Sequence, residues 1–222
     1  MDLGPILDFL RDLKAHNDRE WFQSQTTRWH HARDQFKAFV ETLLDSLSES
    51  APAWAGHDAA DCIFRLHRDL RFAKDKSPYK TNVSAFFSAA GRSVHDPGFY
   101  VSLEPDGKSM LAAGLYQPTP GELSTLRAAI AADARPLRQI LAAAKLRKAF
   151  PDGLNGEKSK TVRGYRPDHP AWDLLQIKSL IVWREFSDHD IQNGTFAKLA
   201  RPALQSSLPL CEWLDHSRRS RS

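Results

Sequence analysis

Positive charge is concentrated in one short stretch of this chain, Cys62 to Thr81, which we call the basic segment. The segment contains six cations and two carboxylates, so its net charge equals the +4 of the whole 222-residue chain. The cations are Arg65, Arg68, Arg71, Lys74, Lys76 and Lys80, and the carboxylates are Asp69 and Asp75. Guanidinium groups bind carboxylates and phosphates through paired hydrogen bonds. The basic segment therefore predicts a site for an anion.

The order of apolar and polar residues predicts how these charges are presented. Apolar side chains alternate with polar ones, which is the period of a β-strand; the apolar set is Phe64, Leu66, Leu70 and Phe72, and the polar set is Arg65, His67, Asp69 and Arg71. Arg68 interrupts the alternation, so the strand ends near it or contains a bulge there. We predict a strand at Cys62 to Arg68 and an ordered loop at Lys74 to Lys80. Proline favours a turn at Ser77-Pro78.

Each candidate site residue has a role that follows from its chemistry. Asp69 and Tyr79 could handle protons beside a bound anion, and His169, in the irregular basic stretch 151–170, could join them. The predicted ligand-binding residues are Arg65, Arg68, Arg71, Lys74, Lys80 and Arg163. Because Arg71 lies on the polar face, Arg71→Ala is predicted to abolish binding of a phosphate-bearing small molecule without unfolding the protein.

Three kinds of function are compatible with these residues. The favoured one is binding of a small phosphate- or carboxylate-bearing ligand, with or without catalysis. A nucleic-acid-binding protein would place cations on phosphates and aromatic rings on bases, but +4 on 222 residues is a modest charge for that role. In a structural or interaction module, the charges would form a buried hydrogen-bond network. A pocket favours the first function, a flat basic stripe the second, and burial of Arg68 against Asp69 the third.

The basic segment also resembles a known family. The run from Arg65 to Thr81 (RLHRDLRFAKDKSPYKT) is similar to the hallmark of the domain-of-unknown-function 2461 family, uncharacterised proteins of bacteria and fungi. The matching positions are Arg65, Arg68, Asp69, Arg71, Phe72, Lys74, Asp75, Lys76, Pro78, Tyr79, Lys80 and Thr81. The resemblance implies family membership and no particular reaction. His67 departs from the family, which more often has an aromatic residue such as tyrosine there, and this weakens any mechanism that needs an imidazole.

Further stretches extend the resemblance over nearly the whole chain. They are Asn17 to Phe22 (NDREWF), Pro97 to Tyr100 (PGFY), Gly114 to Pro118 (GLYQP), Arg163 to Pro170 (RGYRPDHP) and Pro209 to Trp213.

Composition and missing motifs narrow the remaining classes. No stretch approaches the ~20 apolar residues of a membrane span, the first residues lack a signal-peptide pattern, and two cysteines are too few for a disulfide framework. We therefore expect a soluble, cytoplasmic protein without a membrane partner. The sequence contains no glycine-rich phosphate loop, nucleophile elbow or zinc-binding helix, so we expect no cofactor and no metal.

Periodicity predicts an α+β fold, in which a central antiparallel sheet is packed by a long N-terminal helix and C-terminal helices. Helical spacing runs from Phe22 to Leu47, and Asn17 with Glu20 is typical of a helix N-terminus. Strand patterns occur at 82–89, 99–103, 109–116 and 179–183, and helical patterns return at 122–131, 137–150 and 191–204. We predict one domain at 1–217 and a disordered basic tail at 218–222.

Overall fold

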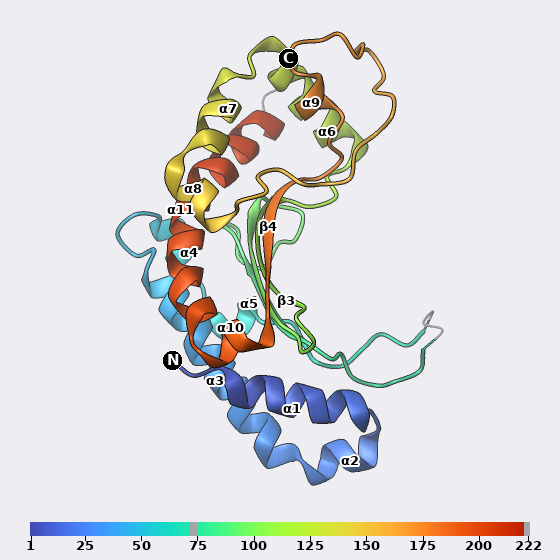
Figure 1. Ribbon diagram of the computed structural model, residues 1–222, viewed down its shortest axis with the longest axis vertical. Helices are drawn as coiled ribbons and strands as arrows, with labels where there is room; N and C mark the ends of the chain where they lie inside the picture. The colour runs from blue at the N-terminus through green and yellow to red at the C-terminus, as the bar shows by residue number, and fades with distance from the viewer. Residues whose placement is uncertain (72–74, 220–222) are drawn as a thin grey trace. The chain divides into compact units, whose positions relative to one another are not determined.

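The computed structural model describes Met1–Arg71 and Asp75–Arg219 (Figure 1). Its N-terminal part is helical: α1 is Gly4–Ala15, α2 is Arg19–Ser24, α3 is Thr26–Asp45, α4 is Pro52–Ala55 and α5 is Ala59–Cys62. Helix α1 buries Ile6, Leu7, Phe9, Leu10 and Leu13, and it packs against α3. Their apolar residues recur at helical spacing, so each helix has one face to bury.

The first turn of α2 shows how a predicted start shifted by one residue. Asp18, rather than Asn17, is the N-cap, and its carboxylate accepts a hydrogen bond from the amide of Trp21. An N-cap acceptor satisfies an amide that has no partner inside the helix. The side chain of Asn17 is thereby left for a different contact, described below.

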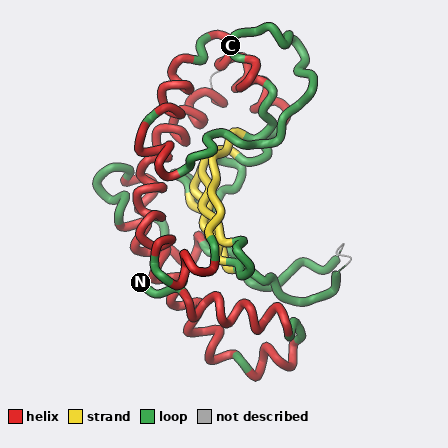
Figure 2. Tube along the Cα trace, in the orientation of Figure 1, coloured by secondary structure: helices red, strands yellow, loops and turns green. Residues whose placement is uncertain are grey.

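Among the described residues, four strands form a single sheet in the order β1-β2-β3-β4. Figure 2 shows the strands together in yellow. The strands are β1 (Val83–Phe87), β2 (Gly98–Leu103), β3 (Ser109–Leu115) and β4 (Leu180–Phe186). The turn between β2 and β3 contains Asp106 and Gly107, both with positive φ. Neighbouring strands joined by a tight turn run antiparallel, so the predicted α+β fold with an antiparallel sheet is confirmed.

The remaining helices are α6 (Pro120–Ala132), α7 (Arg135–Ala142), α8 (Ala144–Ala149), α9 (Trp172–Leu175), α10 (Asp188–Gln192) and α11 (Thr195–Arg219). Of these, α6 to α9 lie between β3 and β4 along the chain, and α10 and α11 follow β4. Helix α6 begins with a capping box between Thr119 and Glu122. Within the described residues, no helix is long and apolar enough to span a membrane.

The chain divides into two compact units. The first unit contains Met1–Arg92, Tyr100–Leu111 and Glu185–Arg201. The second contains Ser93–Phe99, Ala112–Arg184 and the rest of the chain from Pro202. The basic segment lies in the first unit, whereas Arg163 and His169 lie in the second.

An ion-pair network ties the end of α11 into the second unit. The side chain of Arg218 is only 9% exposed and binds the carboxylates of Asp96, Glu122 and Asp215. Burial opposes ionisation of Asp96, but hydrogen bonds from Ser93 and Arg218 outweigh it and lower the pKa of the Asp96 carboxyl. Arg218 and Arg219 therefore belong to α11, although the sequence assigned both to the tail.

Candidate anion-binding site

The described parts of the basic segment form two antiparallel arms, which Figure 1 shows as long loops that extend away from the strands. The arms are joined by a bridge between His67 and Tyr79. The amide of Arg68 donates to the carbonyl of Pro78 at 2.9 Å, and that of Lys80 donates to the carbonyl of Leu66 at 2.8 Å. One arm then reaches the sheet, because Ile63 bridges Ala85 of β1.

The predicted strand at Cys62 to Arg68 is therefore wrong in its extent. Cys62 is the last residue of α5, and Ile63 and His67 make only isolated bridges. These bridges are four residues apart on one arm but six apart on the other, from Tyr79 to Ala85. The extra residues interrupt the ladder, as in a bulge, so alternation in the sequence did not produce a continuous strand.

Arg68 is neutralised within the basic segment. Its guanidinium binds the carboxylate of Asp75 and the hydroxyl of Ser77. Hydrogen bonds from the Ser77 amide, the Arg68 side chain and the Ser77 hydroxyl lower the pKa of the Asp75 carboxyl to about 2. Arg68 thus orders the turn before Pro78 and already has an anionic partner.

Arg71 is neutralised in the same way by Asp69. Its Nε lies 3.0 Å from Oδ1 of Asp69, and Nη2 lies 2.6 Å from Oδ2. Both side chains remain in water, with exposed fractions of 78% for Arg71 and 45% for Asp69. Hydrogen bonds from the Arg71 side chain and amide lower the pKa of Asp69. Asp69 is therefore a permanent carboxylate at neutral pH rather than a proton donor.

Two other cations, Lys80 and Arg92, lie over the ring of Phe64. Arg65 is near enough to Lys80 for its charge to act on that ammonium, and we call these three cations the Phe64 cluster. Nζ of Lys80 and Cζ of Arg92 each lie 5.6 Å from the ring centre. Nη1 of Arg92 also donates to the carbonyl of Ile63 at 2.7 Å. Cations over an aromatic face are attracted by its quadrupole, so Phe64 gathers charges that otherwise repel each other.

The electrostatics of Lys80 reflect this crowding. Burial lowers the pKa of the Lys80 ammonium, and the positive charges of Arg65 and Arg92 lower it further. Among the described residues, no carboxylate forms an ion pair or hydrogen bond with any member of the Phe64 cluster. The charge of Arg65 is felt by Asp69, but the carboxylate of Asp69 is bound by Arg71. An incoming anion would relieve this repulsion.

Tyr79 has a different environment from the cations. Its side chain is 5% exposed, its ring stacks on that of Phe22 at 4.1 Å between centres, and the ring of His67 lies 5.0 Å away. Asn17 holds its backbone, donating from Nδ2 to the Tyr79 carbonyl and accepting the Tyr79 amide at Oδ1. Tyr79 thus anchors one arm of the basic segment to the N-terminal helices.

The two site residues predicted from the stretch 151–170 lie in the second unit. Nδ1 of His169 accepts the amide of Ala171 at 3.0 Å, and its ring meets that of Tyr165 edge to face. This contact holds the turn before α9. Arg163 is exposed, in a turn closed by a bridge between Val162 and Tyr165. Their predicted meeting with the basic segment stays a prediction.

One predicted ligand residue, Lys74, lies outside the described residues. Conversely, sequence reasoning missed Arg92, which follows Gly91 in the loop after β1 and lies 28 residues after Phe64 in the sequence. Gly91 has a φ of +77°, and a glycine before a basic residue was the only local signal. Within the described part of the chain, no group of three or more histidine, cysteine, aspartate and glutamate side chains could hold a metal ion.

Comparison with known proteins agrees with the resemblance of the motifs. No curated protein matches this chain. No solved structure matches it either. A family model described as a conserved hypothetical protein, DUF2461, matches residues 5–213. With the match running from the first helix into the last, the chain belongs to the DUF2461 family.

Proposed function

We propose that this protein binds a small phosphate- or carboxylate-bearing ligand at the Phe64 cluster. The observation that carries the proposal is the proximity of Arg65, Lys80 and Arg92, none of which forms an ion pair with a carboxylate among the described residues. Charge-assisted hydrogen bonds from guanidinium and ammonium groups to oxyanions are among the stronger ones in proteins. An anion at this position would gain them without first breaking an internal ion pair.

The cluster narrows the ligand-binding set predicted from the sequence. Arg68 and Arg71 are in the predicted ligand-binding set because they are cationic. Each guanidinium, however, already forms an ion pair with a carboxylate of the basic segment. An anion would have to displace Asp75 or Asp69, both tethered within a few residues. Arg65, Lys80 and Arg92 therefore carry the proposed contact.

Binding is better supported than catalysis by the same geometry. A general acid or base works best with a pKa near the working pH, whereas Arg71 lowers the pKa of Asp69. Tyr79 is enclosed by aromatic rings. A buried structural network is not favoured, because the pair Arg71–Asp69 is largely exposed.

Calorimetric titration with inorganic phosphate and with sulfate tests the proposal. Arg65→Gln and Lys80→Gln should each weaken binding about tenfold, since a hydrogen bond to a charged group contributes roughly 1.5–3 kcal/mol. Arg71→Gln is the matched control, and its guanidinium is already occupied by Asp69. We expect that control to change affinity by less than about twofold.

Two results would contradict the proposal. If neither anion binds the folded wild-type protein, the Phe64 cluster is not an anion site. If Arg71→Gln weakens binding as much as Arg65→Gln, the anion sits at the exposed arm instead, as the sequence suggested for Arg71.

A further inference from the structure

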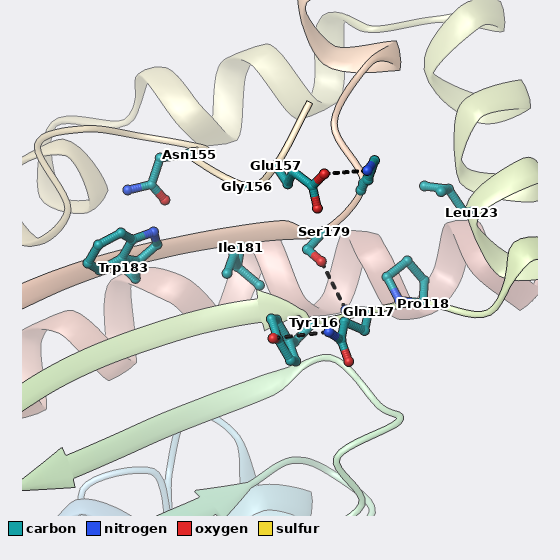
Figure 3. A pocket seen from close by; sticks show the side chains of 11 residues that line it. Tyr116, Gln117, Pro118, Leu123, Asn155, Gly156, Glu157, Ser179, Ile181 and Trp183 are labelled. Atoms are coloured by element: carbon teal, nitrogen blue, oxygen red, sulfur yellow. Dashed lines mark hydrogen bonds and ion pairs between the residues drawn. The ribbon is translucent and has the colours of Figure 1, made fainter. Parts of the chain in front are cut away.

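The second unit contains a pocket of about 500 Å³ at the end of β3 and the start of β4 (Figure 3). None of its residues belongs to the basic segment. Its walls come from the turn after β3, from the stretch before β4 and from β4 itself; the lining residues used below are Tyr116, Gln117, Asn155, Glu157, Lys178 and Trp183. The volume is in the range of sites that hold small molecules.

An extended segment along β4 forms one wall of the pocket. Leu154 bridges Val182, and Lys158 bridges Ile177. Between these bridges the chain passes so close to Ser179 that a Cβ on Gly156 would lie 2.1 Å from the Ser179 carbonyl oxygen. Only glycine permits this approach, and the close pairing fixes Asn155 and Glu157 on either side of Gly156.

Two aromatic rings line the pocket and remain accessible. Tyr116 is 59% exposed, one of the few large apolar residues left in water. Trp183 is half-buried on the same face of β4 as Ile181, and Figure 3 shows its ring at the same end of the pocket as Asn155. An indole offers a broad flat surface on which another planar ring can stack.

Asn155 supplies the most specific signal in the pocket. Its Oδ1 is buried and has no hydrogen-bond partner in the described part of the chain. Leaving a buried polar atom unpaired costs roughly 1–3 kcal/mol. If the Asn155 side chain turns so that Oδ1 faces the pocket, a ligand that donates an N–H or O–H to it would remove that cost.

Gln117 is held in an unusual conformation beside the same pocket. Its φ of +48° is rare for a residue with a side chain. The amide of Gln117 donates to Oγ of Ser179 at 3.0 Å, and its Nε2 lies 3.1 Å from the hydroxyl of Tyr116. These bonds hold Tyr116 and Gln117 in place, and strained backbone of this kind concentrates at functional sites.

The pocket presents no net charge to a ligand. Its two ionised side chains, Glu157 and Lys178, form an ion pair with each other. An anion or a cation would have to compete with that pair. The pocket therefore suits an uncharged ligand, in contrast to the Phe64 cluster.

We propose that this pocket binds an uncharged, planar nitrogen heterocycle, such as a nucleobase presented as a nucleoside. A carboxamide offers an acceptor and a donor side by side, which matches the donor and acceptor edge of a base, as when asparagine pairs with adenine. The ring of the ligand would stack on Trp183, because every base has a π-face and stacking tolerates different bases. Oδ1 of Asn155 would receive the exocyclic or ring N–H.

The aromatic and amide groups also distinguish this ligand from a sugar. A saccharide needs hydrogen-bonding groups around its rim, but Glu157 and Lys178 are paired and Gln117 is engaged with Tyr116. The polar atom of the pocket that is both buried and unpaired is Oδ1 of Asn155. One directional acceptor beside a flat ring fits a base better than a polyol.

Ligand-observed saturation-transfer NMR with adenosine, uridine and a methyl glucoside tests the proposal on the full chain. We expect both nucleosides to receive saturation and the glucoside to receive none. Asn155→Leu and Trp183→Leu should each reduce the nucleoside signal at least about fivefold, the size expected when a base loses its stacking or hydrogen-bonding partner. Trp183→Phe, which keeps a flat ring, should retain part of the signal.

A matched substitution outside the pocket serves as a control for effects on nucleoside binding that do not come from the pocket. Gln139→Leu replaces an exposed amide on α7 and should leave nucleoside binding unchanged. Thermal unfolding shows whether each variant folds. Asn155→Leu should be as stable as the wild type or more so, because replacing an unpaired buried polar atom by an apolar group of similar size is close to neutral.

Three outcomes would overturn the proposal. The first is that neither nucleoside binds the wild type at millimolar concentration. The second is that the glucoside binds and the nucleosides do not. The third is that folded Asn155→Leu and Trp183→Phe both bind adenosine as the wild type does, which would place the nucleoside elsewhere. The Phe64 cluster is tested with phosphate and sulfate, so either proposal can fail without the other.

Discussion

The side chain of Asn17 brackets the backbone of Tyr79: Nδ2 donates to the carbonyl at 3.0 Å and Oδ1 accepts the amide at 3.1 Å. A carboxamide in this position replaces the partner strand that Tyr79 lacks on that side. The contact joins two of the stretches that carry the family resemblance, NDREWF and the basic segment. It therefore explains why an asparagine placed before α2 does not cap that helix.

Asn17→Ala should destabilise the protein by about 1–3 kcal/mol, since both the amide and the carbonyl of Tyr79 lose their partner in a partly buried position. Denaturant unfolding measures the change. Gln23→Ala, at an exposed position of α2, should shift stability by no more than about 0.5 kcal/mol. Equal effects of the two substitutions would mean that the bracket contributes nothing.

Removal of the Arg218 side chain should lower the stability of the folded protein. Arg218→Met leaves Asp96 and Glu122 without their cation at a site where the arginine is 9% exposed, so we expect a loss of about 3 kcal/mol. Arg219→Met is the control, because Arg219 is 65% exposed and forms its ion pair with Asp215. Its effect should stay below about 1 kcal/mol. A harmless Arg218→Met would show that the network adds no stability.

Acid should remove the stabilising contribution of the Asp75 carboxylate over a defined pH range. The pKa of Asp75 is about 2 in the folded protein, below its ordinary value of 3.8. A lowered folded pKa stabilises the folded state above the ordinary value, and this stabilisation disappears as the pH falls from 3.8 through about 2. Carbon-detected NMR titration of the carboxyl groups measures the midpoint.

Arg68→Met should raise that midpoint toward the ordinary value, because one of the hydrogen bonds to Asp75 is lost. Asp133, whose pKa is also about 2 through its pairing with Arg135, provides an internal reference. Its titration should not move in Arg68→Met. An unchanged Asp75 midpoint would show that Arg68 does not hold the carboxylate.

The affinity of the Phe64 cluster for sulfate should fall at high pH. Lys80 must be protonated to bind an anion, and its pKa is lowered by burial and by Arg65 and Arg92. Affinity should therefore decline below the pH at which an ordinary lysine, with a pKa of about 10.4, would lose its proton. Sulfate keeps a constant charge over this range, so calorimetry reports the protein. A pH-independent affinity would exclude Lys80 from the site, and Lys80→Gln should abolish the dependence.

Salt separates a small anion from a nucleic acid as the natural ligand. A nucleic acid that contacts several phosphates should lose affinity with a log–log slope of about −0.7 to −0.9 per contact. A single anion at the Phe64 cluster releases few counterions, so its binding should weaken far less with salt, as expected for a partly buried contact. Tight, steeply salt-dependent binding of single-stranded oligonucleotides would favour the nucleic-acid alternative instead.

The sheet was predictable because its pattern is local. Strands β1, β2 and β3 lie where period-two alternation placed them, to within a few residues at either end. The strand predicted at Cys62 to Arg68 is wrong in its extent for the opposite reason, because its pairing depends on residues outside that stretch. Alternation reports which side chains could share a face, but it does not report how many residues the partner arm inserts between two bridges.

The candidate site was predictable only in part. Most of its charges lie close together in the sequence, yet the sequence does not say which cation a nearby carboxylate will bind. Asp69 forms its ion pair with Arg71, two residues away, and forms none with Arg65. Arg92 and Arg218 contact residues that lie far from them in the sequence and come close only in the folded protein. Arg218 meets Asp96 across more than half of the chain, and no local pattern distinguishes such a residue from a solvated tail.

Two glycines allow segments of the backbone to pass close to Ser179 and Leu180. One of them, Gly114, belongs to the stretch Gly114 to Pro118 that carries part of the family resemblance, and its role there differs from that of Tyr116. In this stretch, a Cβ on Gly114 would lie 2.1 Å from the carbonyl oxygen of Leu180. Any side chain at position 114 would therefore impair folding, whether or not a ligand is bound. Tyr116 and Gln117 face no such demand. In a saturation mutagenesis experiment, substitutions at Gly114 and Gly156 would therefore reduce the yield of folded protein, whereas substitutions at Tyr116 would register only in a screen that selects for the ligand.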